Sequence, residues 1–288
     1  MKNKTISVIG GDSRQLFCSE HLRHLGYDVT VYGCELGKIN KEVVTATDLK
    51  TAFKSEYIIL PLPVSKSSGF LNTPLSEKNI ELKHVIENTT EKNSVFFGMG
   101  SKMFTKMIEA KAGKIYDYFE SDELILKNAF LTAESLLGII LDKTKISVNG
   151  MRVAVTGYGR IGSILCHMLN ALGADVSVFL RNSLQYTKAN LDNTKAFYYD
   201  KLAEKINTFD CIVNTVPARI FSDDILKEIN DECVIIECAS APYGFDFERC
   251  ETLGVSVIKG FSLPGKKRPK TAGIIIAETV DSIIKGEM

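Results

Sequence analysis

The sequence predicts an α/β protein with two doubly wound parallel-sheet domains, the first flavodoxin-like and the second Rossmann-like, joined by long interdomain helices. Two observations predict this fold. Each half of the chain opens with a short apolar strand that runs into glycines and then a helical pattern, at Thr5–Ile9 and again at 151–156. Each half then alternates apolar runs with helical patterns, as units of parallel strands with crossover helices require.

The first half carries the elements of one such domain. Its predicted strands are Thr5–Ile9, 27–32, 57–60, Ser94–Phe97 and 114–118. A helix that ends at Gly26 follows the first strand, and further helical patterns span about 76–87 and 101–112. We therefore expect residues 1–120 to form an N-terminal domain that holds the substrate and the catalytic groups.

The second half carries the other domain. Its predicted strands are 151–156, Asp175–Leu180, 197–199, 211–215, 233–238 and 255–258. Six strands are the full number of the doubly wound dinucleotide-binding fold, which we assign to residues 146–269.

Two helices are expected to connect the domains. An apolar helix over about 120–144, capped by Ser121 or Asp122, predicts a linker at 121–145. A last helix within 270–288, after a basic loop, is expected to pack back on the first domain. Two connections of this kind would leave a hinged cleft.

The turn after the strand 151–156 has the spacing of a dinucleotide fingerprint, Gly157-Tyr158-Gly159-Arg160-Ile161-Gly162. The first glycine permits the sharp turn, the second lets the backbone approach a pyrophosphate, and the third lets helix and strand pack closely. The helix that follows offers unpaired N–H groups to phosphates. We expect all six residues to contribute to a cofactor site.

The next strand predicts which dinucleotide is bound. Arg181 stands at its end, where an acidic residue that holds the ribose 2′-hydroxyl of NAD is expected. A guanidinium grips a 2′-phosphate with two hydrogen bonds, and Asn182 and Ser183 can add others, so we expect NADP.

Two further loops follow strands of this domain. The segment Asn214-Thr215-Val216-Pro217 is expected along the ribose and nicotinamide side of the cofactor. Ser240 follows the fifth strand and is a candidate contact to the nicotinamide amide or to the substrate. Each segment could instead be a simple turn.

Composition disfavours other classes of function. The formal net charge is zero, which gives no general attraction to nucleic acid or to an anionic membrane. Four histidines without a metal-binding spacing predict no metal site. Seven cysteines without a CxxC pair predict reduced core thiols. With no signal peptide and no apolar stretch of membrane-spanning length, we expect a cytoplasmic protein.

Several motifs along the chain together resemble one family, the A subunit of dipicolinate synthase from spore-forming bacteria. The motifs are Val8-Ile9-Gly10-Gly11-Asp12-Ser13-Arg14-Gln15, Ile59-Leu60-Pro61, Thr132-Ala133-Glu134, Gly157-Tyr158-Gly159-Arg160-Ile161-Gly162, Asn214-Thr215-Val216-Pro217, Leu263-Pro264-Gly265 and Pro269-Lys270-Thr271-Ala272-Gly273. The resemblance implies NADP-linked oxidation of dihydrodipicolinate to pyridine-2,6-dicarboxylate in the mother cell during sporulation. It also implies that the partner is a flavoprotein-like B subunit, and a homo-oligomer stays open.

A substrate with two carboxylates needs cations with directed donors. Arg14 is the first candidate because it follows a strand end and can bind a carboxylate with two hydrogen bonds. Lys270 and Thr271, at the start of the last helix, come second. Ser65 and Lys66 lie in a third candidate segment.

Oxidation also releases a proton to a base. Asp12 and Glu134 are the acidic residues of the family-like motifs, and either one acts as the base or orients Arg14. Asp12 could instead only cap the first helix, and Glu134 could be an ion-pair partner. Lys270 completes the set of catalytic candidates.

Three other functions compete with this one. A 2-hydroxyacid dehydrogenase needs a histidine late in the nucleotide domain, but the last histidine is His167, on the first helix of that domain. A shikimate-dehydrogenase-like enzyme would need a lysine–aspartate pair in the first domain, which the sequence does not single out. A non-catalytic NADP-binding regulatory subunit stays open.

Overall fold

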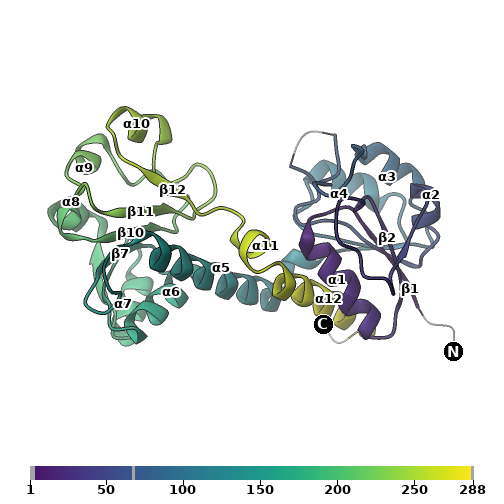
Figure 1. Ribbon diagram of the computed structural model, residues 1–288, viewed down its shortest axis with the longest axis horizontal. Helices are drawn as coiled ribbons and strands as arrows, with labels where there is room; N and C mark the ends of the chain where they lie inside the picture. Colours follow the sequence, from purple (N-terminus) through teal and green to yellow (C-terminus); the bar gives the residue numbers. More distant parts are fainter. Residues whose placement is uncertain (1–3, 67–68, 287–288) are drawn as a thin grey trace. The chain divides into compact units, whose positions relative to one another are not determined.

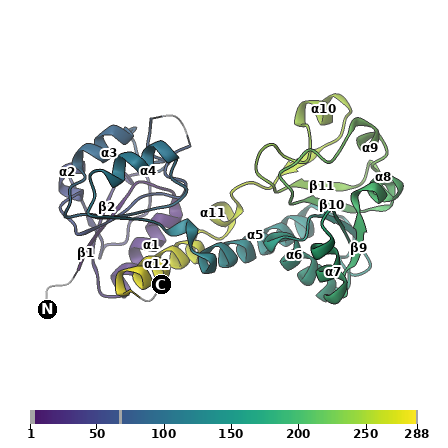
Figure 2. The same ribbon diagram turned by 180° about the vertical axis from the view of Figure 1, so that it is seen from behind.

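Residues 4–66 and 69–286 are described here from a computed structural model (Figures 1 and 2). The chain divides into two compact units, Met1–Asn128 with Gly265–Met288, and Ala129–Pro264. It passes between them twice, once within helix α5 (Asp122–Lys143) and once within the short helix α11 (Leu263–Lys267). Each unit is built on a six-stranded parallel sheet, so the two doubly wound domains expected from the sequence are confirmed.

The first unit alternates strands and helices. Its strands are β1 (Thr5–Ile9), β2 (Asp28–Tyr32), β3 (Val44–Thr45), β4 (Tyr57–Ile59), β5 (Ser94–Phe97) and β6 (Lys114–Asp117). Its helices are α1 (Ser13–His24), α2 (Leu49–Ala52), α3 (Leu82–Asn88), α4 (Lys102–Glu109), the 3₁₀ turn η1 (Tyr118–Glu120), and α12 (Pro269–Lys285) from the end of the chain.

The strand order of this sheet is β3-β2-β1-β4-β5-β6. Without β3, the five predicted strands lie in the flavodoxin order, 2-1-3-4-5. With β3 the order becomes that of a dinucleotide-binding sheet, 3-2-1-4-5-6. The sequence missed β3 because it is only two residues long and both are exposed, so it has no apolar run.

The C-terminal helix α12 packs directly on α1, and both figures show the two helices side by side (Figures 1 and 2). A Cβ atom added to Gly273 would lie 2.3 Å from the Arg14 carbonyl oxygen, so the two helix backbones are in close contact there. The Tyr27 hydroxyl, just before β2, donates a 2.7 Å hydrogen bond to the buried Asp281 carboxylate of α12. Small residues and this bond therefore fix the last helix to the first unit.

The second unit has the same alternation. Its strands are β7 (Arg152–Thr156), β8 (Asp175–Leu180), β9 (Lys195–Tyr198), β10 (Cys211–Asn214), β11 (Val234–Glu237) and β12 (Val257–Lys259). Its helices are α6 (Arg160–Ala171), α7 (Ser183–Leu191), η2 (Tyr199–Lys201), α8 (Leu202–Lys205), η3 (Ile206–Thr208), α9 (Asp223–Lys227) and α10 (Phe247–Thr252).

The order β12-β11-β10-β7-β8-β9 is the full dinucleotide-binding order. One hydrophobic core packs α5, α6 and α7 on one face of the sheet, around residues such as Leu136, Leu165 and Ala189. A second core packs α8, α9 and α10 on the other face, around Leu202 and Leu226. The order reverses between β7 and β10, which is where such sheets bind dinucleotides.

Two predicted segments differ from the structure. The helix predicted over 76–87 begins only at Leu82, and an isolated bridge between Phe70 and Glu81 holds the chain before it. The predicted basic loop before the last helix contains α11, because the lysines of Gly265-Lys266-Lys267 are good helix formers.

Helix α5 has the length and mean hydropathy of a membrane span, the one such case in the described part of the chain. Half of its apolar window is buried inside the protein, and Lys127 and Glu134 interrupt its apolar residues. Its buried residues Ala133, Leu136 and Ile140 belong to the core of the second unit. Its hydropathy therefore reflects a core helix.

Candidate dinucleotide and substrate sites

The glycine turn joins β7 to α6 and has the geometry that a dinucleotide requires. Gly157 has a φ of +87°, and a Cβ there would lie 2.5 Å from Val216. A Cβ on Gly162 would lie 2.2 Å from the Gly157 carbonyl oxygen, so both positions exclude a side chain. Gly159, which caps α6, has open space around it, so a pyrophosphate can approach the helix N-terminus.

The side chains within this turn are not equivalent. Tyr158 is 2% exposed and belongs to the core, and its hydroxyl donates a 2.9 Å bond to Asp192. Ile161 packs against the same core. Only the backbones of these two residues are therefore available to a cofactor, whereas Arg160 is exposed at the start of α6.

The end of β8 carries the candidate ribose site. Arg181 is exposed and forms no ion pair with any described residue, so its guanidinium is available to an anion. The Asn182 Oδ1 atom caps α7 by accepting bonds from the amides of Leu184 (2.8 Å) and Gln185 (3.3 Å). Ser183 is the first residue of that helix and is exposed. These three residues thus surround one helix N-terminus.

A buried polar network links the ends of three adjacent strands, β7, β10 and β11. The Thr156 hydroxyl donates a 2.5 Å bond to the Asn214 side-chain oxygen, and the Asn214 amide donates to both Glu237 oxygens, at 2.7 and 2.9 Å. The Thr215 hydroxyl donates 2.7 Å to the Thr156 carbonyl. The Val216 amide donates 3.1 Å to the Asn214 side-chain oxygen. The loop Asn214-Thr215-Val216 is therefore held in one conformation beside the glycine turn.

Glu237 is a functional candidate that the sequence did not predict. Its carboxylate is fully buried, and it also accepts bonds from the amides of Ala239 (2.8 Å), Gly244 (2.7 Å) and Phe245 (3.3 Å). Burial raises the pKa of Glu237, and the hydrogen bonds from Asn214 and the loop oppose that shift. An acidic residue ending an apolar strand was the available signal. Ser240 and Pro217 are exposed on the loops nearby.

In the first unit, Asp12 and Arg14 form one ion pair at the carboxyl end of β1. Arg14 is 8% exposed, and its Nε and Nη2 atoms each donate a 2.9 Å bond to one Asp12 oxygen. Its Nη2 also donates to the Leu62 carbonyl. Asp12 caps α1 at the same time, by accepting a 3.0 Å bond from the Arg14 amide.

The ionisation of Asp12 follows from this contact. Burial raises the pKa of Asp12, but the hydrogen bonds and the charge of Arg14, with a smaller effect of the Lys66 charge, outweigh burial and leave the pKa lowered. A carboxylate with a lowered pKa is a weak proton acceptor at neutral pH.

The backbone of α11 and the charge of Lys66 lie near this pair. A Cβ on Gly265 would lie 3.0 Å from Arg14 Nε and 3.2 Å from an Asp12 oxygen, so the α11 backbone covers the ion pair. Lys66 is exposed and its charge reaches Asp12. Ser65 donates 2.6 Å to the Phe70 carbonyl. The segment between Lys66 and Gly69 lies outside the described residues.

Three predicted residues lie on the two longest helices. Lys270 and Thr271 are exposed in the first turn of α12, whose N-terminus favours an anion. Glu134 is half-buried on α5, in the second unit. The contacts within each unit therefore do not bring Glu134 to the Asp12–Arg14 pair.

The described residues contain no group of three His, Cys, Asp or Glu side chains arranged for a metal ion. All seven cysteines are free, and burial raises the pKa of the Cys18 and Cys211 thiols, among others.

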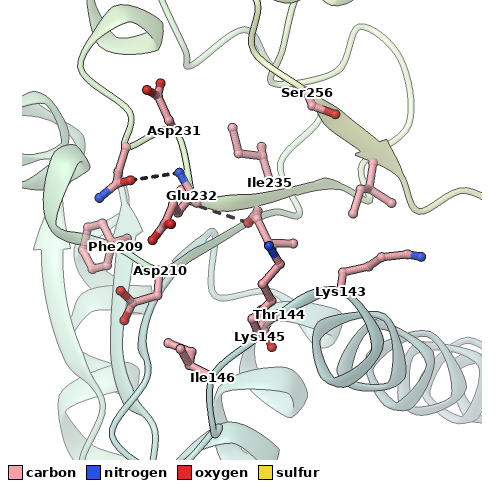
Figure 3. A pocket seen from close by; sticks show the side chains of 14 residues that line it. Lys143, Thr144, Lys145, Ile146, Phe209, Asp210, Asp231, Glu232, Ile235 and Ser256 are labelled. Atoms are coloured by element: carbon pink, nitrogen blue, oxygen red, sulfur yellow. Dashed lines mark hydrogen bonds between the residues drawn. The ribbon is translucent and has the colours of Figure 1, made fainter.

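A cavity of about 540 Å³ in the second unit is drawn in Figure 3. It is lined by Lys143 and Lys145 on one side and by Asp210, Asp231 and Glu232 on another. These acidic residues precede β10 and β11, so the cavity lies at the amino ends of the strands. Dinucleotides bind at the carboxyl ends, so this cavity is not the cofactor site.

Two family matches agree with this geometry. Residues 5–119 match the family described as the N-terminal domain of the dipicolinate synthase A subunit. Residues 140–243 match "D-isomer specific 2-hydroxyacid dehydrogenase, NAD binding domain". The fold, the glycine turn and these matches define the class of protein: an NAD(P)-dependent dehydrogenase with a separate domain for a nicotinamide dinucleotide.

Relatives of full length narrow the class. The dipicolinate synthase A subunit of Bacillus subtilis (strain 168) is 30% identical over 282 residues, 97% of this chain and 95% of that protein. The crystal structure of the same subunit from Bacillus halodurans matches with a TM-score of 0.85 and 27% identity, covering 98% of this chain and 97% of that one. The crystal structure of the subunit from Bacillus subtilis matches with a TM-score of 0.85 and 28% identity, covering 99% of this chain and 97% of that one. The chain belongs to the family of the dipicolinate synthase A subunit.

Proposed function

We propose that this protein oxidises dihydrodipicolinate to dipicolinate, pyridine-2,6-dicarboxylate, with NADP. The observation that carries the proposal is the buried Asp12–Arg14 pair at the carboxyl end of β1, in the domain that matches the family. The Nε and Nη2 atoms of Arg14 make the contacts to Asp12 and Leu62, so a substrate carboxylate would meet the remaining Nη1 atom.

Each residue of this site has a separate role in the proposal. Asp12 holds the guanidinium of Arg14 in one orientation, and its lowered pKa favours this positioning role over that of the base. Lys66, Lys270 and Thr271 supply further positive charge and donors for the second carboxylate, with Ser65 in the same segment as Lys66. Ser240 contacts the nicotinamide amide or the substrate, and Glu134 is kept as a candidate base.

The bound dinucleotide would accept the hydride, and the chain would supply its orientation. The turn Gly157–Gly162 and the α6 N-terminus would hold the pyrophosphate. Arg181, with Asn182 and Ser183, would bind the 2′-phosphate, which favours NADP over NAD. The loop Asn214–Pro217 would lie along the nicotinamide ribose.

The partner and the cellular context in the proposal come from the family. The relative from Bacillus subtilis is named as the A subunit of a synthase, so we propose that a B subunit is the partner. A homo-oligomer of this chain is compatible with that partner. We place the protein in the cytoplasm of the mother cell during sporulation.

The test is an assay at 340 nm with freshly prepared dihydrodipicolinate and NADP, with and without the partner subunit. Appearance of NADPH and of dipicolinate in equal amounts is the expected result. Tight NADP binding without turnover under both conditions would favour the alternative of a regulatory protein that binds NADP.

The dehydrogenase alternatives predict other substrates. Residues 140–243 match the NAD-binding domain of 2-hydroxyacid dehydrogenases. That reaction needs a histidine late in the nucleotide domain, and the sequence has none after His167. Oxidation of a 2-hydroxyacid or of shikimate in the same assay, in place of dihydrodipicolinate, would contradict the proposal and support the corresponding alternative.

A further inference from the structure

The Glu237 carboxylate is surrounded by hydrogen-bond donors alone. Its partners are the Asn214 amide group and the backbone amides of Ala239, Gly244 and Phe245. No lysine or arginine of the described residues forms an ion pair with it, and it is fully buried. A protonated carboxyl would need an acceptor for its hydrogen, and this set of partners offers none. The arrangement therefore fits a buried anion without a counter-charge.

Its surroundings are built around that anion. A Cβ on Gly244 would lie 2.4 Å from the Asn214 side-chain nitrogen, so only glycine fits where the loop crosses the network. The hydrogen bonds reach from Glu237 at the end of β11, through Asn214 at the end of β10, to Thr156 at the end of β7. Strands β10 and β11 lie on one side of the point where the strand order reverses and β7 lies on the other, so the network crosses that point at the carboxyl edge.

A dinucleotide that lies across this edge has its two halves on opposite sides of the glycine turn. Arg181, after β8, marks the adenosine side in the proposed function. The nicotinamide half then extends over β10 and β11, where the Glu237 network lies. Resting on that proposed function, we propose that Glu237 is a positioning residue whose negative charge makes the site prefer the oxidised coenzyme to the reduced one.

The physical reason is the charge of the nicotinamide ring. The oxidised ring carries one positive charge and the reduced ring is neutral, so a nearby buried carboxylate attracts only the oxidised form. The attraction is weakly screened because the carboxylate is out of contact with water. The same carboxylate fixes the loop that carries Ser240.

The test compares binding of NADP⁺ and NADPH by calorimetry for the wild type and Glu237→Gln. We expect the variant to lose affinity for NADP⁺ by on the order of tenfold and for NADPH by less than about threefold. Glu232→Gln is the matched control, since Glu232 is an exposed carboxylate before the same strand. It should leave both affinities unchanged.

If Glu237 had a purely structural role, the substitution would weaken binding of NADP⁺ and NADPH equally. An unchanged ratio of the two affinities in folded Glu237→Gln would therefore overturn the proposal. Glu237→Asp keeps the charge and should keep the wild-type ratio. If Glu237→Gln does not fold, Ser240→Lys introduces a cation on the exposed loop, and it should lower the preference for NADP⁺. An unchanged ratio in that variant would also overturn the proposal.

Failure of the proposed function is distinguishable from failure of this inference. If the wild type binds neither NADP⁺ nor NADPH, but binds NAD⁺ and NADH, the same ratio is measured with that pair. If the wild type binds no dinucleotide, both fail together. If the wild type binds the coenzyme and the ratio of the NADP⁺ and NADPH affinities is the same in Glu237→Gln, only the role of Glu237 is rejected.

Discussion

At the scale of the residue, specificity for the coenzyme depends on one side chain. Arg181 is exposed at the end of β8, forms no ion pair with a described residue, and stands beside the α7 N-terminus. A guanidinium there stabilises an added phosphate, whereas a carboxylate would repel it.

We therefore predict that Arg181→Asp weakens NADP binding on the order of a hundredfold, about 3 kcal/mol, and changes NAD binding much less. Lys188→Asp, within α7 and seven residues after Arg181, is the control for a general loss of positive charge. Equal losses for both coenzymes in Arg181→Asp would contradict the assignment. Calorimetry with each coenzyme gives the answer.

The Asp12–Arg14 pair allows a prediction that separates positioning from proton transfer. Arg14→Ala should raise the Michaelis constant for the substrate, or abolish turnover, and leave NADP affinity unchanged. Asp12→Asn keeps a good cap for α1 but removes the charge that holds Arg14. It should raise the Michaelis constant and leave the pH profile of turnover unchanged. A turnover profile that loses its acidic limb would identify Asp12 as the base instead.

The same pair contributes a pH-dependent term to stability. The folded pKa of Asp12 is lowered, so its contribution is present above the unfolded value of about 4 and is lost as pH falls through the folded value. We expect Asp12→Asn to reduce the pH dependence of unfolding below about pH 4 and to leave it unchanged near pH 7. Denaturant unfolding at several pH values measures this, and an unchanged acid limb would argue against the ion pair.

At the scale of the element, two mid-helix glycines should respond in opposite directions. A Cβ on Gly273 of α12 would meet the Arg14 carbonyl oxygen at 2.3 Å and the Cys18 amide nitrogen at 2.9 Å. A Cβ on Gly138 of α5 would meet nothing within 4 Å. Gly273→Ala should destabilise by about 1–3 kcal/mol through overpacking. Gly138→Ala should stabilise by about 0.5–1 kcal/mol through helix propensity. Circular dichroism in urea measures both, and a stabilising Gly273→Ala would contradict the packing.

Sequence patterns predicted the elements that have strong local signals. Apolar runs predicted the long strands and α5, and glycine spacing predicted the turn at Gly157 because its geometry depends only on neighbouring residues. Strand β3 was missed since two exposed residues carry no pattern. Helix α3 began later than predicted because apolar periodicity does not record where the Phe70–Glu81 bridge stops the chain.

The contacts of the candidate sites also divide into those that the sequence predicts and those that it does not. The contact between Asp12 and Arg14 is local and follows from their spacing. The network of Thr156, Asn214 and Glu237 depends on which strands are neighbours in the sheet, so no single motif could reveal it. Likewise, the approach of Gly265 to Arg14 joins residues from the two ends of the chain.

At the scale of the whole molecule, each unit has its own sheet and its own hydrophobic cores. The candidate dinucleotide residues all lie in the second unit, and the Asp12–Arg14 pair lies in the first. A ligand that binds one unit stabilises that unit by mass action. Its effect on the other unit depends on how strongly the two unfold together.

We therefore predict that NADP at about a hundred times its dissociation constant stabilises the second unit by about 2.7 kcal/mol. Hydrogen exchange should slow for the amides of β7, β8 and β10 and change little for those of β1 and β4. Arg181→Asp at the same NADP concentration is the control. With a hundredfold weaker affinity the stabilisation falls to about 0.4 kcal/mol, so most of the protection should be lost. Equal protection of both units would show that they unfold as one cooperative body. Protection confined to the first unit would place the dinucleotide in the other domain and would reject the cofactor site.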